Sequence, residues 1–169
     1  MDGFEKGILK QLVPAETDPV SRPAHARKKK DDPPRADHWP NPILLERAAF
    51  LRRLAKAGDG QASETLHQYP GHAAMLSFRA RSGVVELHEN FADLFCVLDG
   101  RATLLTGGTV VGPETIAPGE IRGTAIEGGV RQELRPGDVA YVPAGVPHQI
   151  LVQGKKTFSS FVLKIEQRR

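Results

Sequence analysis

Apolar and polar residues alternate over short stretches from residue 63 to the end of the chain, and turn residues separate these stretches. An alternation with a period of two residues indicates strands whose faces differ in polarity. The pattern predicts strands at 63–68, 73–80, 84–88, 94–98, 101–106, 132–134, 139–142, 148–152 and 157–164. Many short strands with regular turns are typical of an antiparallel sandwich or barrel. We therefore predict an all-β fold for this part of the chain.

One helix is predicted ahead of the strands. Apolar residues recur at helical spacing from Ile43 onward, and basic residues occupy much of the opposite face. Asn41 followed by Pro42 is typical of an N-cap and a first helical residue. Gly58 then ends the pattern. We expect a helix over 41–58 that packs its apolar stripe on the outside of the barrel.

The first 40 residues differ from the rest of the chain. They contain six of the 13 prolines and few large apolar residues. A basic cluster at 27–30 is followed by two aspartates that neutralise part of its charge. This composition indicates an extended arm. The predicted organisation is therefore an N-terminal arm over 1–40, the helix over 41–58 and a β domain over 59–169.

Composition narrows the classes of function. The length of 169 residues suits one domain, and the net charge of +3 gives no reason to expect a nucleic-acid partner. No stretch approaches the roughly 18 apolar residues of a membrane helix, and the first residues lack the pattern of a secretory signal. We expect a cytoplasmic protein with no membrane partner. The single cysteine, Cys96, excludes an internal disulfide and is expected to be a small buried apolar residue.

A cluster of polar residues interrupts the apolar pattern near the middle of the chain. Alternation from residue 84 places Glu86, His88 and Asn90 on one face of a strand. Asp93 follows, just before the strand at 94–98. The Asp-Gly pair at 99–100 is a strong signal for a hairpin turn into the next strand. His88 and Asp93 are therefore expected on consecutive strands, near the same turn.

A second segment places another histidine at the start of a strand. A turn at 136–138 precedes the strand at 139–142, and a turn rich in proline and glycine follows at 143–147. His148 opens the next strand directly after this turn. In this position its side chain is well placed to point inward at the rim of a barrel.

The two segments resemble the two sequence motifs of the cupin superfamily. The first motif has a histidine-any-histidine pair, a glutamate and a glycine seven residues later. Here His88, Asn90, Asp93 and Gly100 stand at these positions, so the second histidine and the glutamate are both replaced. The resemblance implies a double-stranded β-helix, or jelly roll, with a central pocket. It implies no particular reaction, because this fold hosts many activities.

The second motif is matched more closely, by Gly137, Pro143, Gly145 and His148. Its final asparagine position is occupied by Val152. Because cupins are commonly dimers, the resemblance also implies a homodimer.

The resemblance implies a metal site formed by His88, Asp93 and His148, with Asn90 as a weak oxygen ligand. Two histidines and a carboxylate suit Fe(II), Mn(II), Ni(II) or Zn(II) and leave coordination positions open. Glu86 can bind the metal, orient His88 or act as a catalytic general base. In the alternative interpretation, these residues line a polar pocket without metal.

The segment 107–129 is rich in glycine and proline and separates the two motifs. One interpretation is a long decorated hairpin. The other is a flap over the pocket in which Glu120 and Arg122 face the ligand, with Arg122 binding a substrate carboxylate in a bidentate manner.

The leading hypothesis for function is a small cupin that binds a divalent metal and a small organic ligand, which can be anionic, in its barrel. Such a protein can be a metal-dependent oxygenase or isomerase. The alternative is a non-catalytic, metal-free cupin that binds or senses a small molecule.

Overall fold

The computed structural model describes residues 36–167, so most of the predicted arm lies outside the described residues. A single helix, α2 (Asn41–Ala57), precedes the strands in this part of the chain. The strands are β1 (Gln61–Tyr69), β2 (His72–Arg79), β3 (Val85–His88), β4 (Phe91–Gly100), β5 (Ala102–Thr106), β6 (Thr109–Val111), β7 (Glu114–Ala117), β8 (Glu120–Gly123), β9 (Ala125–Glu127), β10 (Val130–Leu134), β11 (Val139–Val142), β12 (His148–Leu151) and β13 (Phe158–Glu166). Every predicted strand is present, with ends that differ by at most three residues.

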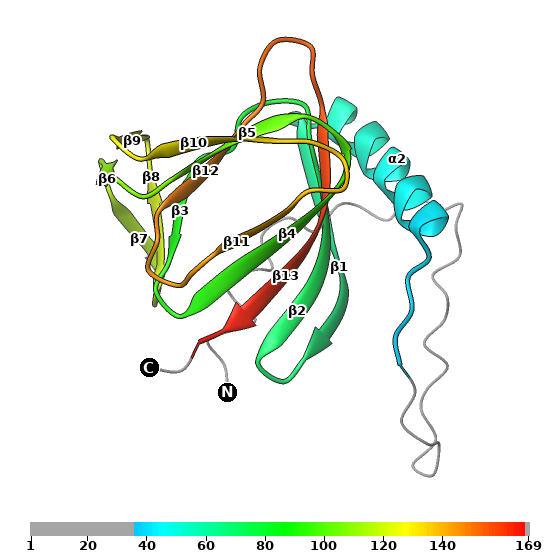
Figure 1. Cartoon of the computed structure of the whole chain (residues 1–169), viewed down its shortest axis with the longest axis horizontal. Coiled ribbons are helices and arrows are strands. Elements are labelled where there is room, and N and C mark those ends of the chain that lie inside the picture. Colours follow the sequence, from blue (N-terminus) through cyan, green and yellow to red (C-terminus); the bar gives the residue numbers. More distant parts are fainter. Residues whose placement is uncertain (1–35, 168–169) are drawn as a thin grey trace.

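Two antiparallel sheets face each other and form the barrel (Figure 1). The five-stranded sheet has the order β1-β2-β13-β4-β11, and the six-stranded sheet has the order β10-β5-β12-β3-β8-β7. A separate two-stranded ladder joins β6 and β9. Consecutive strands alternate between the two sheets along much of the chain, as in a jelly roll. The predicted all-β jelly-roll fold is confirmed.

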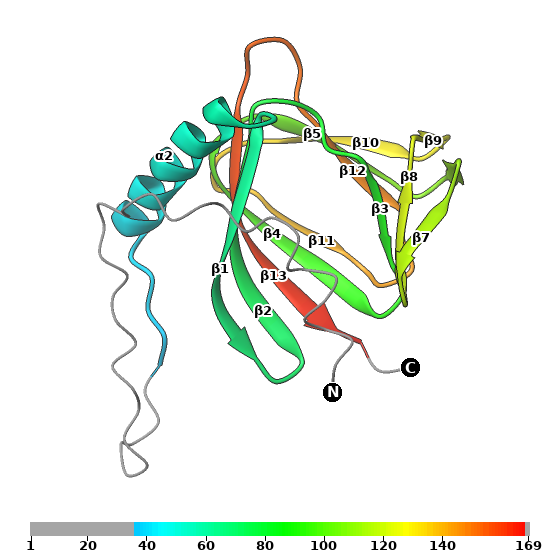
Figure 2. The ribbon, with the colours of Figure 1, turned by 180° about the vertical axis from the view of Figure 1, so that it is seen from behind.

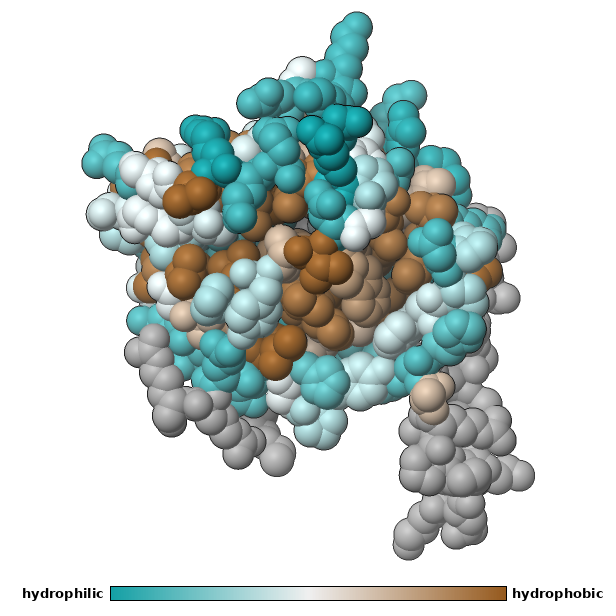
Figure 3. All heavy atoms as spheres, viewed as in Figure 1, coloured by the Kyte–Doolittle hydropathy of each residue, from teal (hydrophilic) through white to brown (hydrophobic). Residues whose placement is uncertain are grey.

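The hydrophobic core lies between the two sheets. Its buried members come from both, with Phe95 and Phe158 on the five-stranded sheet and Leu104 and Ile150 on the six-stranded sheet. On the face shown in Figure 3, hydrophobic residues gather over the middle and hydrophilic residues surround them. The core therefore fills one part of the barrel and leaves the polar residues described below in the other.

Helix α2 packs on the outer face of β1 and β2 (Figure 2), as expected. Its buried residues Leu44, Ala48, Leu51 and Ala55 lie against Leu76 and other outward-facing side chains of the sheet. The first helical residue is Asn41 and the N-cap is Pro40, without a side-chain hydrogen bond, so the prediction of Asn41 as the N-cap was wrong by one residue. No helix of the described residues is long and apolar enough to cross a membrane.

The last residues of the predicted arm contact the barrel. The ring of Trp39 lies 5.7 Å from that of Phe161 on β13, measured between centroids. Asp37 accepts a hydrogen bond from the hydroxyl of Tyr69 at the end of β1. The folded domain therefore begins before residue 41.

The predicted hairpin at 99–100 is wrong. Strand β4 pairs with β13 and β11, whereas β5 belongs to the opposite sheet. Gly100 has a φ of +81°, and a Cβ placed there would lie 1.9 Å from the carbonyl oxygen of Thr157. The Asp-Gly pair thus marks the bend where the chain crosses from one sheet to the other, and only glycine fits this close approach.

The segment between the two motifs is built of strands, in agreement with the interpretation as a decorated hairpin. Strand β8 pairs with β3 and extends the six-stranded sheet, and β7 pairs with the outer edge of β8. The pairing sets Glu120 opposite His88 and Arg122 opposite Glu86. This segment therefore adds two charged side chains beside the predicted site.

Candidate metal centre

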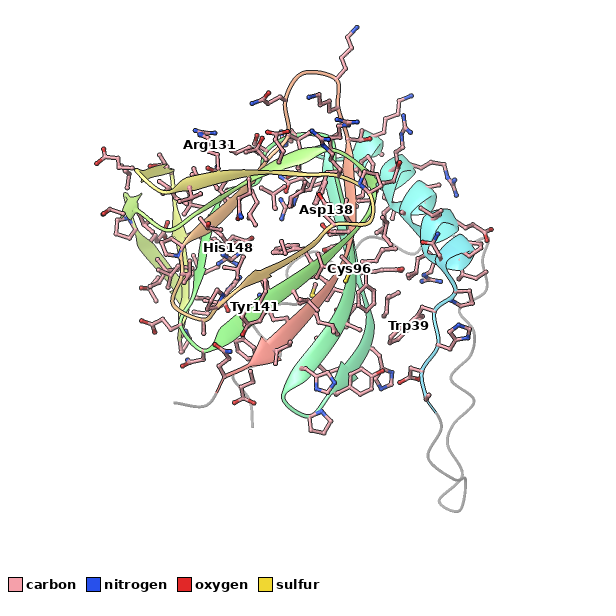
Figure 4. The ribbon with its side chains drawn as sticks, in the orientation of Figure 1. Trp39, Cys96, Arg131, Asp138, Tyr141 and His148 are labelled. Carbon is pink, nitrogen blue, oxygen red and sulfur yellow. The ribbon has the colours of Figure 1, made fainter. Side chains whose placement is uncertain are left out.

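Four side chains from both sheets meet inside the barrel. Glu86 and His88 come from β3, His148 comes from the neighbouring strand β12, and Asp93 comes from β4 of the opposite sheet. Each offers one ligand atom, and these four atoms all lie within 4.8 Å of one another. His88, Asp93 and His148 are each at most 3 % exposed. The side chain of His148 points into the space between the sheets (Figure 4).

The four atoms form a ring in which histidine nitrogens and carboxylate oxygens alternate. Oδ2 of Asp93 lies 3.4 Å from Nε2 of both His88 and His148. Oε2 of Glu86 lies 3.6 Å from Nε2 of His88 and 3.8 Å from Nε2 of His148. These distances are too long for good hydrogen bonds, which are about 2.7–3.2 Å.

Both histidine Nε2 atoms are buried and have no hydrogen-bond partner among the residues that the structure describes. Unpaired buried polar atoms are rare in native proteins and need an explanation. Nε2 of both histidines and one carboxylate oxygen each of Glu86 and Asp93 would hold a divalent metal ion, for which nitrogen and oxygen atoms are suitable ligands. The donor set therefore fits a divalent metal.

The second ring nitrogen of each histidine faces an oxygen atom. Nδ1 of His88 lies 2.7 Å from Oε2 of Glu120, and Nδ1 of His148 lies 3.3 Å from the carbonyl oxygen of Val146. Such contacts fix the tautomer that leaves Nε2 free for a metal. Glu120, predicted as a ligand-binding residue, thus lies behind His88 at the edge of the cluster.

The cluster shifts the pKa values of its members toward their charged forms. Burial alone would lower the pKa of His88, but its contacts with Asp93, Glu120 and Glu86 raise that pKa to about 10. Burial alone would raise the pKa values of the three carboxyl groups, but contacts with the histidines and nearby positive charges lower them. In the metal-free protein, His88 therefore carries a second proton and a positive charge, and the carboxyl groups around it are ionised.

Lys164 is a further member of the site. It lies opposite Asp93 on the neighbouring strand β13, and its Nζ donates a hydrogen bond to Oδ1 of Asp93 at 2.8 Å. The side chains of Lys164 and Asp93 are 12 % and 4 % exposed, respectively. Asp93 thus presents one oxygen to the histidines while the other is held by a cation.

The cluster lies in a cavity of about 380 Å³ between the sheets. Arg122 and Glu120 line this cavity from β8, and Arg79 lines it from β2. Met75, Phe95 and other apolar side chains form part of the wall. The cavity is thus large enough for a small organic molecule beside the cluster.

Asn90 is not brought to the cluster. Strand β3 ends at His88, so the prediction that alternation continues to Asn90 was wrong. Asn90 is exposed in the turn before β4, and its carbonyl oxygen accepts a hydrogen bond from the backbone of Gln167. The two alternating residues that reach the cluster are therefore Glu86 and His88, whereas the sequence pattern predicted His88 and Asn90.

Two cations of the site, Lys164 and Arg79, were missed in the sequence. Each continues the alternation of inward-facing residues along its strand, and both line the cavity. The available signal was a charged residue on a strand face whose preceding members are uncharged. Cys96 is half-buried on β4 and is not a cavity-lining residue, and burial raises the pKa of its thiol.

The sequence was also compared with models of known protein families. A family model described as cupin matches residues 60–168. The chain belongs to the cupin family. No curated protein matches it.

Several solved structures are similar to this cupin. The TT1209 protein of Thermus thermophilus has a TM-score of 0.49 and 19 % identity, over 70 % of this chain and 95 % of that one. The DMSP lyase DddQ of Ruegeria pomeroyi DSS-3 has a TM-score of 0.46 and 20 % identity, over 63 % and 47 % of the two chains. A cupin superfamily protein of Desulfitobacterium hafniense DCB-2 has a TM-score of 0.44 and 22 % identity, over 62 % of this chain and 76 % of that one.

Proposed function

We propose that this cupin is a metal-dependent enzyme that holds a divalent metal between Glu86, His88, Asp93 and His148 and acts on a small organic molecule in the adjoining cavity. The observation that carries this proposal is the ring of alternating nitrogen and oxygen atoms. Both of its nitrogens are buried and lack a hydrogen-bond partner within residues 36–167. In a metal-free pocket, neither nitrogen would have a hydrogen-bond partner among the described side chains and backbone groups.

The donor set favours Mn(II) or Fe(II). Imidazole suits iron, nickel and zinc, whereas carboxylate oxygens suit harder ions such as manganese. Two histidines with two carboxylates combine both preferences, and no thiolate lies in the cluster. Glu86, His88, Asp93 and His148 would hold such an ion, and the adjoining cavity would give substrate and water access to it.

A metal in this site would supply Lewis acidity toward a substrate oxygen or a position for dioxygen, which are the chemistries of isomerases and oxygenases. The chain itself contributes the surroundings of the site. Glu120 holds His88 in the tautomer that presents Nε2, and Lys164 compensates the charge of buried Asp93. We propose that the reaction belongs to one of these two classes.

Metal analysis of the purified, untagged protein tests the site. We expect one manganese or iron per chain after reconstitution and its loss in His88→Ala and His148→Ala. His38→Ala is the matched control, because His38 is exposed and outside the cluster. Equal metal content in the control and the two cluster variants would contradict the proposed site.

The open positions are tested by water proton relaxation of the Mn(II)-loaded protein. We expect strong enhancement, because water would exchange at the metal beside the cavity. A metal without exchangeable water would contradict the enzymatic proposal and favour a purely structural ion.

The homodimer and the cytoplasmic location expected from the sequence stay predictions. Light scattering would test the homodimer.

A further inference from the structure

The charges of the cavity leave a bound metal uncompensated. Asp59 at the rim pairs with Arg81 at 2.9 Å and is therefore neutralised there. With His88 and His148 neutral as metal ligands, the remaining charged residues of the lining, within residues 36–167, are three carboxylates and three cations: Glu86, Asp93, Glu120, Arg79, Arg122 and Lys164. These six charges cancel, so a divalent metal would give the site an excess of two positive charges. A negatively charged ligand would be favoured there.

Arg122 has one edge of its guanidinium group available for such a ligand. Its Nη1 donates to Oε2 of Glu120 at 3.2 Å and to the carbonyl oxygen of Ile121 at 3.1 Å. Among residues 36–167, neither Nε nor Nη2 has an acceptor within hydrogen-bond distance. These two nitrogens form the fork that binds a carboxylate with two parallel hydrogen bonds.

This free edge lies directly beside the proposed metal position. Glu86 directs Oε2 toward Nε2 of both histidines, and its Oε1 forms a long ion pair with Nε of Arg122 at 4.0 Å. The metal position and the fork are thus separated by the carboxylate group of Glu86. A ligand that reaches both must carry a metal-binding oxygen close to its own carboxylate.

The rest of the wall indicates the character of the ligand beyond its acid group. Apolar side chains line the cavity from the five-stranded sheet and from β12: Met75, Phe95, Phe158, Val162 and Ile150. An apolar chain of several carbons would bury its surface against them, with a gain of about 0.8 kcal/mol per CH₂ group in general.

We propose that the cavity binds a small 2-hydroxy or 2-oxo carboxylic acid with an apolar chain, whose carboxylate lies against Nε and Nη2 of Arg122. This inference rests on the proposed function, because the metal would hold the second oxygen. Arg79, also in the lining, adds positive charge from the opposite sheet while one of its guanidinium nitrogens donates to Gln61.

The test is titration calorimetry on the full-length, Mn(II)-loaded protein with 2-hydroxyhexanoate and 1,2-hexanediol as probes. The diol keeps the chain and the hydroxyl next to the end group but lacks the charge. We expect the acid to bind at least tenfold more tightly than the diol. Arg122→Ala should remove this difference, and Arg122→Lys should recover only part of it, because lysine keeps the charge but not the fork.

Arg131→Ala is the matched control, because Arg131 is exposed and lies outside the barrel (Figure 4). Equal affinity for acid and diol, or an unchanged preference in Arg122→Ala, would overturn the inference while Mn(II) binding still supported the metal site. Arg122-dependent binding of the acid to protein that takes up no Mn(II) would instead keep the acid site and overturn the proposed metal centre.

Discussion

Nδ1 of His88 donates a hydrogen bond to Oε2 of Glu120, across the neighbouring strands β3 and β8, at 2.7 Å. Because an ionised carboxylate can only accept, the hydrogen must lie on Nδ1. Nε2 then offers its lone pair to the centre of the cluster once His88 is neutral. Glu120 comes from the segment that separates the two sequence motifs, so this segment supports the proposed metal ligand from behind.

Replacing Glu120 by glutamine should weaken metal binding. The amide keeps the shape of the side chain but loses its charge and can turn its NH₂ group toward Nδ1. Loss of such a partner costs about 10–100-fold in metal affinity. We expect a loss in this range for Mn(II) in Glu120→Gln by calorimetry. Glu114→Gln, on exposed β7, is the control and should bind as the parent does. Parent-like affinity in both variants would show that Glu120 does not position His88.

Replacing Lys164 by methionine should destabilise the metal-free protein more than the metal-loaded one. Removal of the ammonium leaves the buried carboxylate of Asp93 without its cation. Breaking a buried pair from one side costs about 3–5 kcal/mol, and we expect about 3 kcal/mol here because His88 also neutralises Asp93. Bound metal would supply the missing charge and reduce the loss.

Urea unfolding of Lys164→Met with Mn(II) and with a chelator measures this difference. Lys155→Met is the control, because Lys155 is exposed in the turn before β13. An equal loss of stability under both conditions would mean that Lys164 packs against the barrel without compensating the site.

The stability of the metal-free protein should fall as the pH rises from neutral. The pKa of His88 is about 10 in the folded chain, compared with about 6.5 when unfolded. Its protonation therefore stabilises the fold fully below pH 6.5, and this contribution is lost progressively up to pH 10. Thermal unfolding between pH 6 and 10 should show the decrease, and His88→Gln should flatten it. If the stability of the parent protein and that of His88→Gln changed equally with pH, the decrease would not be due to His88.

Replacing Gly100 by alanine should be strongly destabilising. The new Cβ would meet the carbonyl oxygen of Thr157 at 1.9 Å, in addition to the strain of a positive φ. The strain alone costs about 1–2 kcal/mol. Gly154→Ala is the matched control, because its φ is +62° and no atom of the described part of the chain lies within 4 Å of the new Cβ. We expect urea unfolding to show a loss in Gly100→Ala at least twice that in Gly154→Ala. Equal losses would show that β13 moves aside at no cost.

Much of the fold could be predicted from the sequence because the alternation is local. Strand positions and the apolar stripe of α2 follow from side-chain periodicity, which each segment shows by itself. The crossing at Gly100 could not be predicted in the same way. An Asp-Gly pair is compatible with a hairpin turn and also with a bend that lies close to the backbone of another strand. Which of the two forms depends on the strand that pairs with this segment.

The candidate site was predicted in part for a related reason. Alternation places Glu86, His88 and Asn90 on one face, but it does not say which two of them reach the interior. That depends on where β3 ends, which its pairing with β8 and β12 determines. The contact between Lys164 and Asp93 likewise results from the register of β13 with β4, which the sequence of neither strand reveals.

Asp93 belongs to one wall of the barrel, and the other three members of the ring belong to the opposite wall. A bound ion would therefore crosslink the two walls, much as a disulfide would in a protein with more cysteines. Removing it should let the walls separate locally. The amide protons at the end of β3 and the start of β4 should then exchange faster, while those under α2 keep their rates.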